Sequence, residues 1–385
     1  MSNVSVVKNR CTGCGACKNV CPISCIEMVP NQEGFLFPKI SKNCVNCSKC
    51  VSTCPVVNFK KDNPNRIQNG YAGFIDSMED RKKSTSGGVG YAIGKYFLEL
   101  NGVIYGCILD DNLKAMHIRV DTMDKLNATQ SSKYVQSSVD SQFKIVQNDL
   151  ESNKYVAFFG TPCQIAGLKA FLAKDYDKLL LIDIVCHGVP SPLLFQSYIS
   201  YMEKKYKSKI TQYNFRSKNG GGRWESYKSE ITFSENNKSF TIIKDYSTDP
   251  FGYSFIHGDC LRESCYSCSY CSIERISDIT IGDFWGYELN EKLKDIGRKG
   301  ISSVVTNSNK GEIFLNKITG IKLIPIDVSQ ITLKQENLKH PTLRPSSRDS
   351  FYLGIDNPTK FWKKHKPRNQ FRWFVKKMIK LILNK

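Results

Sequence analysis

Two copies of one cysteine pattern stand near the start of this 385-residue chain, and they restrict its fold more than any other feature. Each copy reads C-x2-C-x2-C-x3-C-P, the pattern with which bacterial two-cluster ferredoxins bind iron–sulfur cubanes. Three thiolates of a copy bind one cubane, and the fourth, beside its proline, reaches the other cubane. The predicted ligands of two [4Fe-4S] clusters are Cys11, Cys14, Cys17 and Cys54 for one, and Cys44, Cys47, Cys50 and Cys21 for the other.

Zinc is the alternative metal for these thiols, because four thiolates also suit Zn²⁺. Two full copies of the pattern, each with the proline, favour iron. The first residues form no apolar signal region, and no uncharged apolar stretch approaches the length of a membrane span. With 16 cysteines, many of them spaced as metal ligands, the sequence predicts a reducing, cytoplasmic location.

The charge of the chain is strongly positive but uneven. The formal net charge is +19, and residues 359–385 hold ten Lys or Arg and no acidic residue. A nucleic-acid partner would call for a basic groove interleaved with aromatic residues or a known binding module. The sequence contains neither, so we predict no nucleic-acid partner. The remaining positive charge favours an acidic electron donor or an anionic cofactor.

Beyond the cysteine pairs, apolar runs alternate with helical patterns. Residues 103–109, 155–159 and 179–185 read as strands, and residues 164–172 as a helix between the last two. This order predicts a right-handed βαβ crossover with parallel strands, and residues 210–245 predict antiparallel strands around a glycine loop. The predicted fold class is therefore a multidomain α+β protein, with a small ferredoxin-like two-cluster domain before a larger α/β domain that carries an antiparallel elaboration. The predicted segments are the cluster domain 1–58, a linker 59–69, the main domain 70–345 and a basic tail 346–385.

A second group of cysteines lies in the main domain. Cys163 and Cys186 each follow a predicted parallel strand, at the sheet edge where α/β proteins place their sites. The positions alone leave two quartets open for a third cluster: Cys163, Cys186, Cys265 and Cys268, or Cys260, Cys265, Cys268 and Cys271. We interpret Cys25 and Cys107 as ordinary buried thiols, because a free cysteine packs like a small apolar residue.

Several longer motifs of the main domain resemble a known family. These are Thr85-Ser-Gly-Gly88, Ser132-Lys-Tyr134, Gly160-Thr-Pro-Cys-Gln-Ile-Ala-Gly-Leu168, Asp183-Ile-Val-Cys-His-Gly-Val-Pro190, Phe215-Arg-Ser-Lys218 and Arg275-Ile-Ser-Asp-Ile-Thr-Ile-Gly-Asp-Phe-Trp-Gly286. Together they resemble the beta subunits of coenzyme F420 hydrogenases and dehydrogenases. In particular, they resemble the bacterial branch with a fused ferredoxin domain, which is often found beside polysaccharide pyruvyl transferases. The resemblance covers roughly residues 70–345.

The resemblance implies a flavin-binding main domain with FAD and one further [4Fe-4S] cluster. It also implies electron transfer between the clusters, the flavin and a small molecule. Among the open quartets, it favours Cys163, Cys186, Cys265 and Cys268 as the cluster ligands. Cys260 and Cys271 remain the alternative, in which they replace two of that set.

A Gly/Ser turn supplies the first candidate flavin contacts. Ser84, Ser86, Gly87 and Gly88 precede an apolar-periodic helix at 89–100. Free N–H groups and the positive end of the helix dipole would bind a diphosphate there. The alternative is that these residues only cap the helix.

Further cofactor contacts are predicted from single side chains. Lys133 is assigned a positive charge beside a flavin phosphate or ring, with a solvated surface lysine as the alternative. Tyr134, Trp224 and Trp285 are candidates for stacking on the flavin, or else core aromatic residues. Thr161, from the motif before Cys163, is assigned to cofactor binding as well.

Acid–base candidates are few, because the chain has only five histidines. His187 directly follows a predicted cluster ligand and is suited to pass protons near neutral pH. Asp283 is the second catalytic candidate, since the neighbouring Gly282 allows close approach to a ligand. Asp278, at the other end of the same predicted strand, ranks lower, and His117 is interpreted as a satisfied strand histidine.

The end of the chain predicts an amphipathic helix after Pro367. Phe371, Phe374 and Met378 fall on one face and basic residues on another. Such a helix lies on an anionic membrane surface or, as the alternative, docks on the protein body. Peripheral contact at the inner face of the membrane would bring the protein to a lipid-linked substrate.

The leading hypothesis is a flavin iron–sulfur oxidoreductase. It receives electrons from a low-potential, ferredoxin-like donor and passes them through the clusters to FAD and on to a small substrate. That substrate is coenzyme F420 or, given the neighbourhood of the bacterial branch, a sugar or glycan precursor. The alternatives are a non-catalytic electron-relay subunit of a larger redox complex, and a zinc-binding module for nucleic acid.

Overall fold

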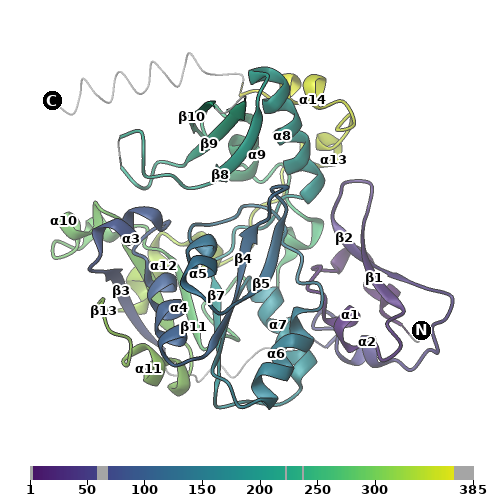
Figure 1. The fold of residues 1–385 in the computed structure, drawn as a ribbon, viewed down its shortest axis with the longest axis horizontal. Helices are drawn as coiled ribbons and strands as arrows, with labels where there is room; N and C mark the ends of the chain where they lie inside the picture. The colour runs from purple at the N-terminus through teal and green to yellow at the C-terminus, as the bar shows by residue number, and fades with distance from the viewer. Residues whose placement is uncertain (1–2, 59–67, 222, 236–237, 368–385) are drawn as a thin grey trace.

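The described residues, 3–58, 68–221, 223–235 and 238–367, form three β-sheets in this computed structural model (Figure 1). The largest sheet has the order β13-β3-β12-β11-β7-β6-β4-β5. Its strands are β3 (Asn69–Ile75), β4 (Val103–Leu109), β5 (Ala115–Val120), β6 (Val156–Gly160), β7 (Leu179–Ile184), β11 (Ile279–Asp283), β12 (Ser302–Thr306) and β13 (Ile321–Ile326).

The centre of the large sheet is parallel, and both of its margins are antiparallel. β4, β6, β7 and β11 pair in parallel, whereas β5 at one side and β12, β3 and β13 at the other pair antiparallel. Between β6 and β7 runs α7 (Pro162–Leu172), which confirms the predicted strand–helix–strand unit with a parallel pair. The carboxyl ends of the four parallel strands therefore meet at one edge of the sheet.

Helices cover both faces of this sheet. One face packs on α4 (Val89–Glu99), α5 (Met123–Thr129) and α11 (Asn309–Leu315), and Phe97 and Leu315 are fully buried there. The other face packs on α6 (Gln142–Glu151) and α7, with Phe143 and Leu168 in the core. Both faces of the parallel strands are thus apolar, as expected for a covered parallel sheet.

A second, smaller layer lies above the carboxyl edge of the large sheet (Figure 1). Its antiparallel sheet consists of β8 (Lys209–Asn214), β9 (Lys228–Glu235) and β10 (Lys238–Asp245), which confirms the predicted antiparallel elaboration. The helices α8 (Pro192–Tyr206), α9 (Pro250–Ile256), α13 (Arg348–Phe351) and α14 (Pro358–Lys364) pack with it around a core rich in aromatic side chains.

The amino-terminal segment contains the hairpin β1 (Ile26–Pro30) and β2 (Leu36–Ile40) and the short helices α1 (Ala16–Val20) and α2 (Lys49–Ser52). Its own core is small and consists largely of cysteines with Val4, Val7 and Ile26. The segment lies against α6 and α7 of the main sheet (Figure 1). The remaining α-helices of the described residues are α3 (Met78–Lys83), α10 (Lys294–Gly297) and α12 (Val328–Leu333).

The basic end of the chain is only partly described. The indole of Trp362, in α14, is fully buried, lies 5.2 Å from the ring of Tyr198 and donates to Ser197 Oγ at 3.2 Å. The start of the predicted tail therefore packs on α8. The predicted amphipathic helix and most of the predicted linker lie outside the described residues. No helix in the described parts of the chain is both long and apolar enough to cross a membrane.

Candidate functional site

A cavity of about 560 Å³ opens at the carboxyl edge of the parallel strands. It is bounded by the residues that follow β6 and β7, by the end of β11, and by the turn before α4. A cavity at this edge agrees with the topology, because α/β proteins bind their ligands at the carboxyl ends of parallel strands. Predicted site residues in its wall are Ser84, Ser86, Gly88, Lys133, Tyr134, Thr161, Cys163, Cys186, His187, Cys265, Cys268 and Asp283.

The turn before α4 is pressed tightly against the sheet. Ser86 Oγ lies 2.8 Å from Ser302 Oγ, and the Gly87 amide donates to the same Ser302 hydroxyl at 3.0 Å. A Cβ on Gly87 would lie only 2.1 Å from the carbonyl oxygen of Gly73. Gly87 therefore allows the turn to approach β3 and β12, although it does not itself line the cavity. Gly88, with φ of 86°, begins α4 without a side-chain cap.

The ammonium group of Lys133 is held by the protein. Its Nζ donates to the carbonyl oxygens of Ala128, Gln130 and Ser131 at 3.0, 2.7 and 3.1 Å, at the carboxyl end of α5. Burial lowers the pKa of Lys133 to about 8. The side chain brings a positive charge to the cavity wall, but all three of its donors are engaged by backbone carbonyls.

A buried arginine that sequence reasoning missed, Arg216, forms an ion pair with Asp283 and links it to Tyr134. Arg216 Nη1 donates to Asp283 Oδ2 at 2.8 Å and to Tyr134 Oη at 2.9 Å, and the guanidinium lies over the ring of Tyr227 at 4.1 Å. Burial alone would lower the pKa of Arg216, but the neighbouring Asp283 carboxylate holds it well above its ordinary value. The motif 215–218 stands out in the sequence, yet nothing in it predicted this partner.

The predicted stacking residues form a wall of aromatic rings. Trp224 stacks on Trp285 with centroids 5.5 Å apart, and Trp285 stacks on Tyr227 at 5.8 Å. Trp285 and Tyr227 line the cavity, whereas Trp224 is buried behind them. Tyr134 lines the cavity while stacking on Phe255 at 4.5 Å. Trp285 and Tyr134 thus keep their candidate role, and Trp224 is a core residue.

The acid–base candidate His187 lies in the cavity wall next to Cys186. Its Nε2 contacts the carbonyl oxygen of Phe255 at 3.0 Å, and its Nδ1 lies 3.1 Å from Thr342 Oγ1. Burial lowers the pKa of His187, so the imidazole is neutral around pH 7. His117 is, as predicted, a satisfied histidine of a strand: it lies in β5 and contacts Phe159 O and Ser137 Oγ.

The amino-terminal cysteines gather into two sets, and Cys25 lies among the four predicted ligands of the second set. Burial raises the pKa of Cys14 to about 12, and repulsion from the neighbouring Cys11 and Cys54 adds to this effect. Burial, and then repulsion from Cys14, Cys11 and Cys54, raises the pKa of Cys17 in the same way. The other set surrounds a small hollow that is lined by Cys21, Cys25, Cys44, Cys47 and Cys50.

The cysteines of the main domain form a third set at the cavity. Burial, and then repulsion from Cys265, Cys163 and Cys268, raises the pKa of Cys186 well above its usual value. Burial is also the main reason that the pKa of Cys265 is raised to about 12. Crowded thiols whose thiolates repel one another are a suitable site for a cationic iron centre, because metal ligation requires the deprotonated form. The three sets therefore fit the predicted clusters.

The structure separates the remaining cysteines by environment. Cys271 lines the cavity, and its hydrogen bond lowers the pKa of Cys268 to about 7. Cys260 is fully buried in the aromatic core and lies outside the cavity wall. Cys25 contacts Cys21, with 3.4 Å between the sulfurs, and Cys107 lines the cavity. Within the described residues, no group of three or more His, Cys, Asp or Glu side chains is placed to hold a single metal ion.

The first and third cysteine sets are neighbours in space. A Cβ on Gly167, in α7, would lie 3.0 Å from Cys14 Sγ, and α7 begins beside Cys163. The buried ring of Tyr270 stands between the sets: burial first, and then the thiols Cys163, Cys14, Cys268 and Cys54, raise the pKa of its hydroxyl. Sequence spacing contains no signal for this juxtaposition, which depends on how the amino-terminal segment docks.

Comparisons with known proteins identify two parts of the chain. Residues 10–58 match the 4Fe-4S dicluster domain, and residues 153–328 match the family described as the C terminus of the coenzyme F420 hydrogenase/dehydrogenase beta subunit. No curated protein matches the chain. Among solved structures, the chain is similar to the F420-reducing [NiFe] hydrogenase complex from Methanosarcina barkeri, studied by xenon derivatization. The identity is 15%, the TM-score is 0.45, and the match covers 78% of this chain and 92% of that one.

The family matches confirm the predicted resemblance and the predicted amino-terminal [4Fe-4S] domain. They cover the segments with the first, second and third cysteine sets, whereas the turn before α4 and Lys133 lie between the two matches. The chain thus joins a segment that matches the 4Fe-4S dicluster domain to a segment that matches the C terminus of the coenzyme F420 hydrogenase/dehydrogenase beta subunit, and these matches support an iron–sulfur redox protein of electron transfer.

Proposed function

We propose that this protein is a flavin-dependent iron–sulfur oxidoreductase that passes electrons from a soluble low-potential donor to a small substrate. One observation carries the proposal: a single cavity joins the third cysteine set to the Gly/Ser turn at the start of α4. FAD bound there would supply the conversion of single electrons into a hydride equivalent. The cavity extends from these cysteines to the turn before α4, so it offers space for a second group beside a cluster, which a relay subunit does not require.

The cavity suits a flavin in size and in chemistry. Its volume of about 560 Å³ lies within the range of roughly 300–1,000 Å³ that is common for ligand sites. Ser84, Ser86 and the amide groups around Gly88 would bind the diphosphate, because the start of an eleven-residue helix favours negative charge. Trp285 and Tyr134 would contact the ring system, and Thr161 lies at the start of α7 beside Cys163.

The cysteine sets would form a route for electrons. The thiols around Cys44 and Cys47 lie nearest the surface, those around Cys14 lie between, and those around Cys163 border the cavity. An electron entering at the exposed Cys47 would thus cross the amino-terminal segment and reach the cavity through the third set. Low potentials are common for ferredoxin-type clusters, so reduction of the substrate is the favoured direction.

Two residues are proposed for work on the substrate. The neutral His187 would hold a proton at the cavity wall and pass it to or from the reacting group. The Asp283 carboxylate, fixed by Arg216, would accept a hydrogen bond from a substrate or ribityl hydroxyl. Coenzyme F420 and a sugar or glycan precursor are the two proposed substrate classes.

The electron donor is proposed to dock at the amino-terminal segment. Cys47 is exposed there, and the apolar side chains of Ile23 and Val45 are 46% and 64% exposed beside it. Residues 1–58 contain six Lys or Arg and two Glu. An exposed apolar patch on a segment of net positive charge fits a small acidic protein such as a ferredoxin.

Metal and flavin analysis of protein purified without oxygen tests the proposal. We expect about twelve irons and one FAD per chain, and bleaching of the flavin by dithionite. Turnover of coenzyme F420 or of nucleotide-linked sugars with reduced ferredoxin would then identify the substrate class. About eight irons without flavin would contradict the proposal and favour the relay subunit, and zinc in place of iron would contradict both.

A further inference from the structure

Arg262 is a buried cation without a carboxylate partner in the described part of the chain. The residue is 1% exposed, and no Asp or Glu lies within ion-pair distance of it there. Its Nε donates to the carbonyl oxygen of Cys11 at 2.7 Å, and its Nη1 lies 3.4 Å from Gln136 Oε1. Its Nη2 is buried and has no hydrogen-bond partner within the described residues. A buried, uncompensated guanidinium is costly, so the position calls for a negative charge nearby.

The guanidinium lies between the first and the third cysteine sets. On one side it binds the backbone of Cys11, and a Cβ on Gly13 would lie 3.2 Å from its Nη1. On the other side, burial raises the pKa of Cys163 and Cys265, while the charge of Arg262 acts on both thiols in the opposite direction. Arg262 is thus bonded to the backbone of both sets, since its side chain donates to the Cys11 carbonyl oxygen and its own carbonyl oxygen accepts from the Cys265 amide at 2.8 Å.

Surrounding groups fix the guanidinium at this position. It lies over the ring of Phe37, 4.1 Å from the centroid, and 5.6 Å from that of Phe35. Gln136, its partner on one side, also accepts from the Leu36 amide at 3.1 Å. The neighbouring Ser264 hydroxyl donates to the same Cys11 carbonyl at 3.0 Å. These residues belong to the joint, that is, the interface between the amino-terminal segment and the main domain. They hold the guanidinium in place and leave it little freedom to rotate.

We propose that Arg262 is a shared electrostatic partner of the iron–sulfur centres at the first and third cysteine sets, and that its free Nη2 donates to a thiolate or sulfide of one of them. The proposal rests on the proposed function. With clusters bound, one electron would pass from the centre held by the Cys11 set, which would be oxidised, to the centre held by the Cys163 set, which would be reduced. The guanidinium keeps its protons and stabilises the reduced form on either side, because a nearby positive charge favours the added electron.

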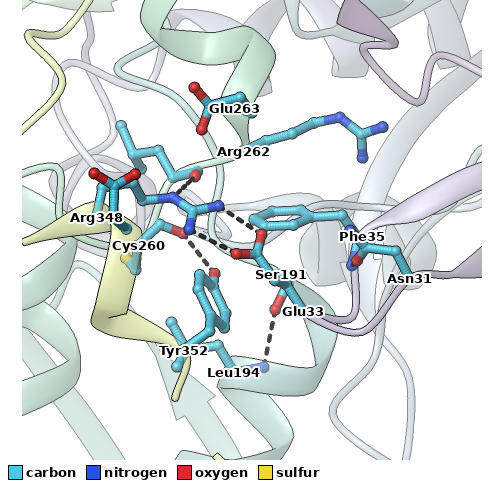
Figure 2. A network of polar contacts seen from close by, with 12 residues as sticks. Asn31, Glu33, Phe35, Ser191, Leu194, Cys260, Arg262, Glu263, Arg348 and Tyr352 are labelled. Carbon is cyan, nitrogen blue, oxygen red and sulfur yellow. Dashed lines mark hydrogen bonds and ion pairs between the residues drawn. The ribbon is translucent and has the colours of Figure 1, made fainter. Parts of the chain in front are cut away.

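A second buried arginine provides a matched control. Arg348 is 3% exposed, close to the burial of Arg262, and belongs to the same joint (Figure 2). All arms of its guanidinium are engaged, since Nε donates to Leu261 O and Nη1 and Nη2 donate to Glu33. Figure 2 shows the Arg262 side chain extending away from this network. Arg348 therefore stabilises the joint with a fully partnered guanidinium, in contrast to Arg262.

Redox titration of anaerobically purified full-length protein, followed by electron paramagnetic resonance, tests the proposal. The variants are Arg262→Gln, which removes the charge, Arg262→Lys, which keeps it, and Arg348→Gln. In Arg262→Gln, we expect full iron content and a reduction equilibrium at least about tenfold less favourable, a shift of about 59 mV to lower potential for a one-electron couple. Arg262→Lys should recover most of the shift, and Arg348→Gln should show none.

Three results would overturn the proposal. They are unchanged potentials in Arg262→Gln with full iron, an equal shift in Arg348→Gln, and loss of iron in both Arg262→Gln and Arg262→Lys, which would leave Arg262 a purely structural role. These outcomes are distinct from a failure of the proposed function. In that case the unsubstituted protein itself would lack flavin or a third of the expected iron.

Discussion

Arg348 and Glu33 are 315 residues apart in the sequence, and their side chains form two parallel hydrogen bonds of 2.7 and 2.6 Å (Figure 2). The pair joins the turn of the amino-terminal hairpin to α13, near the other end of the described chain. Gly34, next to Glu33 with φ of 84°, lets this turn lie against Leu193 of α8, where a Cβ would come within 2.1 Å of the Leu193 Cβ. Residues near the carboxyl-terminal end of the described chain therefore hold the amino-terminal segment in place.

Removal of Glu33 should destabilise the protein more than removal of Arg348. Glu33→Ala leaves a buried cation without its partner, whereas Arg348→Met leaves a carboxylate whose side chain is 32% exposed and can be hydrated. We expect a loss of about 1–3 kcal/mol for Glu33→Ala in the free energy of unfolding, measured by anaerobic urea titration. A larger loss for Arg348→Met would contradict this reading of the pair.

Iron content should separate the two quartets that the sequence left open. Cys265→Ala removes a thiol at the cavity and should lower the iron content by about a third, that is, about four of about twelve irons. Cys260→Ala is the matched control, since Cys260 is buried in the aromatic core, and it should keep its iron. Equal iron loss in both variants would show that Cys260 is a ligand.

Flavin retention should depend on Gly87. A Cβ at this position would meet the Gly73 carbonyl oxygen at 2.1 Å and the Ser302 amide at 2.8 Å, and neither backbone atom can move aside easily. Gly87→Ala should therefore shift the turn, lose bound FAD and cost about 1–3 kcal/mol in stability. In the control, Gly94→Ala, the position lies in α4 but outside the cavity wall, the Cβ meets only side-chain atoms of Leu126, and flavin should be retained. Full FAD content in Gly87→Ala would contradict the proposed phosphate site.

Stability should fall in mild acid because of His117. Burial lowers its pKa from 6.5 in the unfolded chain to about 4, so the folded state favours the neutral ring. The unfolded state binds more protons between these values. The stabilisation is complete above pH 6.5 and is lost as the pH falls toward 4. From pH 6.5 to 5.5 the loss should be about 1 kcal/mol, and His117→Gln should remove that part of the pH dependence. An identical pH dependence in His117→Gln would refute this assignment.

Binding to anionic membranes should depend on the end of the chain. The predicted amphipathic helix lies in residues 368–385, outside the described part, so its role remains a prediction. Full-length protein should pellet with vesicles that contain phosphatidylserine, and protein that ends at residue 367 should stay in the supernatant. Neutral vesicles are the control, because the predicted attraction is largely electrostatic. Failure of the full-length protein to pellet would exclude membrane contact by this segment.

The parts of the site that were predicted from sequence are those set by local patterns. Cysteine spacing predicted a set of Cys11, Cys14, Cys17 and Cys54, and the structure brings these thiols close together, because three of them are close in sequence and the fourth is placed by its proline. Apolar runs located the central strands, since strands buried on both faces read as continuous apolar segments. The carboxyl edge of those strands then placed the site.

The parts that were missed depend on contacts between distant segments. Nothing near Arg216 indicates that it pairs with Asp283, and nothing near Arg262 indicates that it binds Cys11. Spacing also treats Cys260 and Cys271 alike, although one is sealed in the core and the other faces the cavity. For Lys133, the sequence predicted a positive charge beside a flavin, or else a solvated surface lysine, but not the three carbonyl oxygens that accept from its ammonium group.

The docking of the amino-terminal segment has a consequence for biosynthesis. All eight of its predicted cluster cysteines leave the ribosome long before Arg262 and Arg348 are translated, and these two arginines secure the joint. The helices α6 and α7, on which the segment rests, are translated by residue 172, so the packing surface exists well before the two arginines. The hydrogen bonds from Arg262 to Cys11 and from Arg348 to Glu33 form only after residues 262 and 348, respectively, are translated. A chain that ends before residue 262 therefore has the packing surface for the cluster segment without the two bonds that secure it.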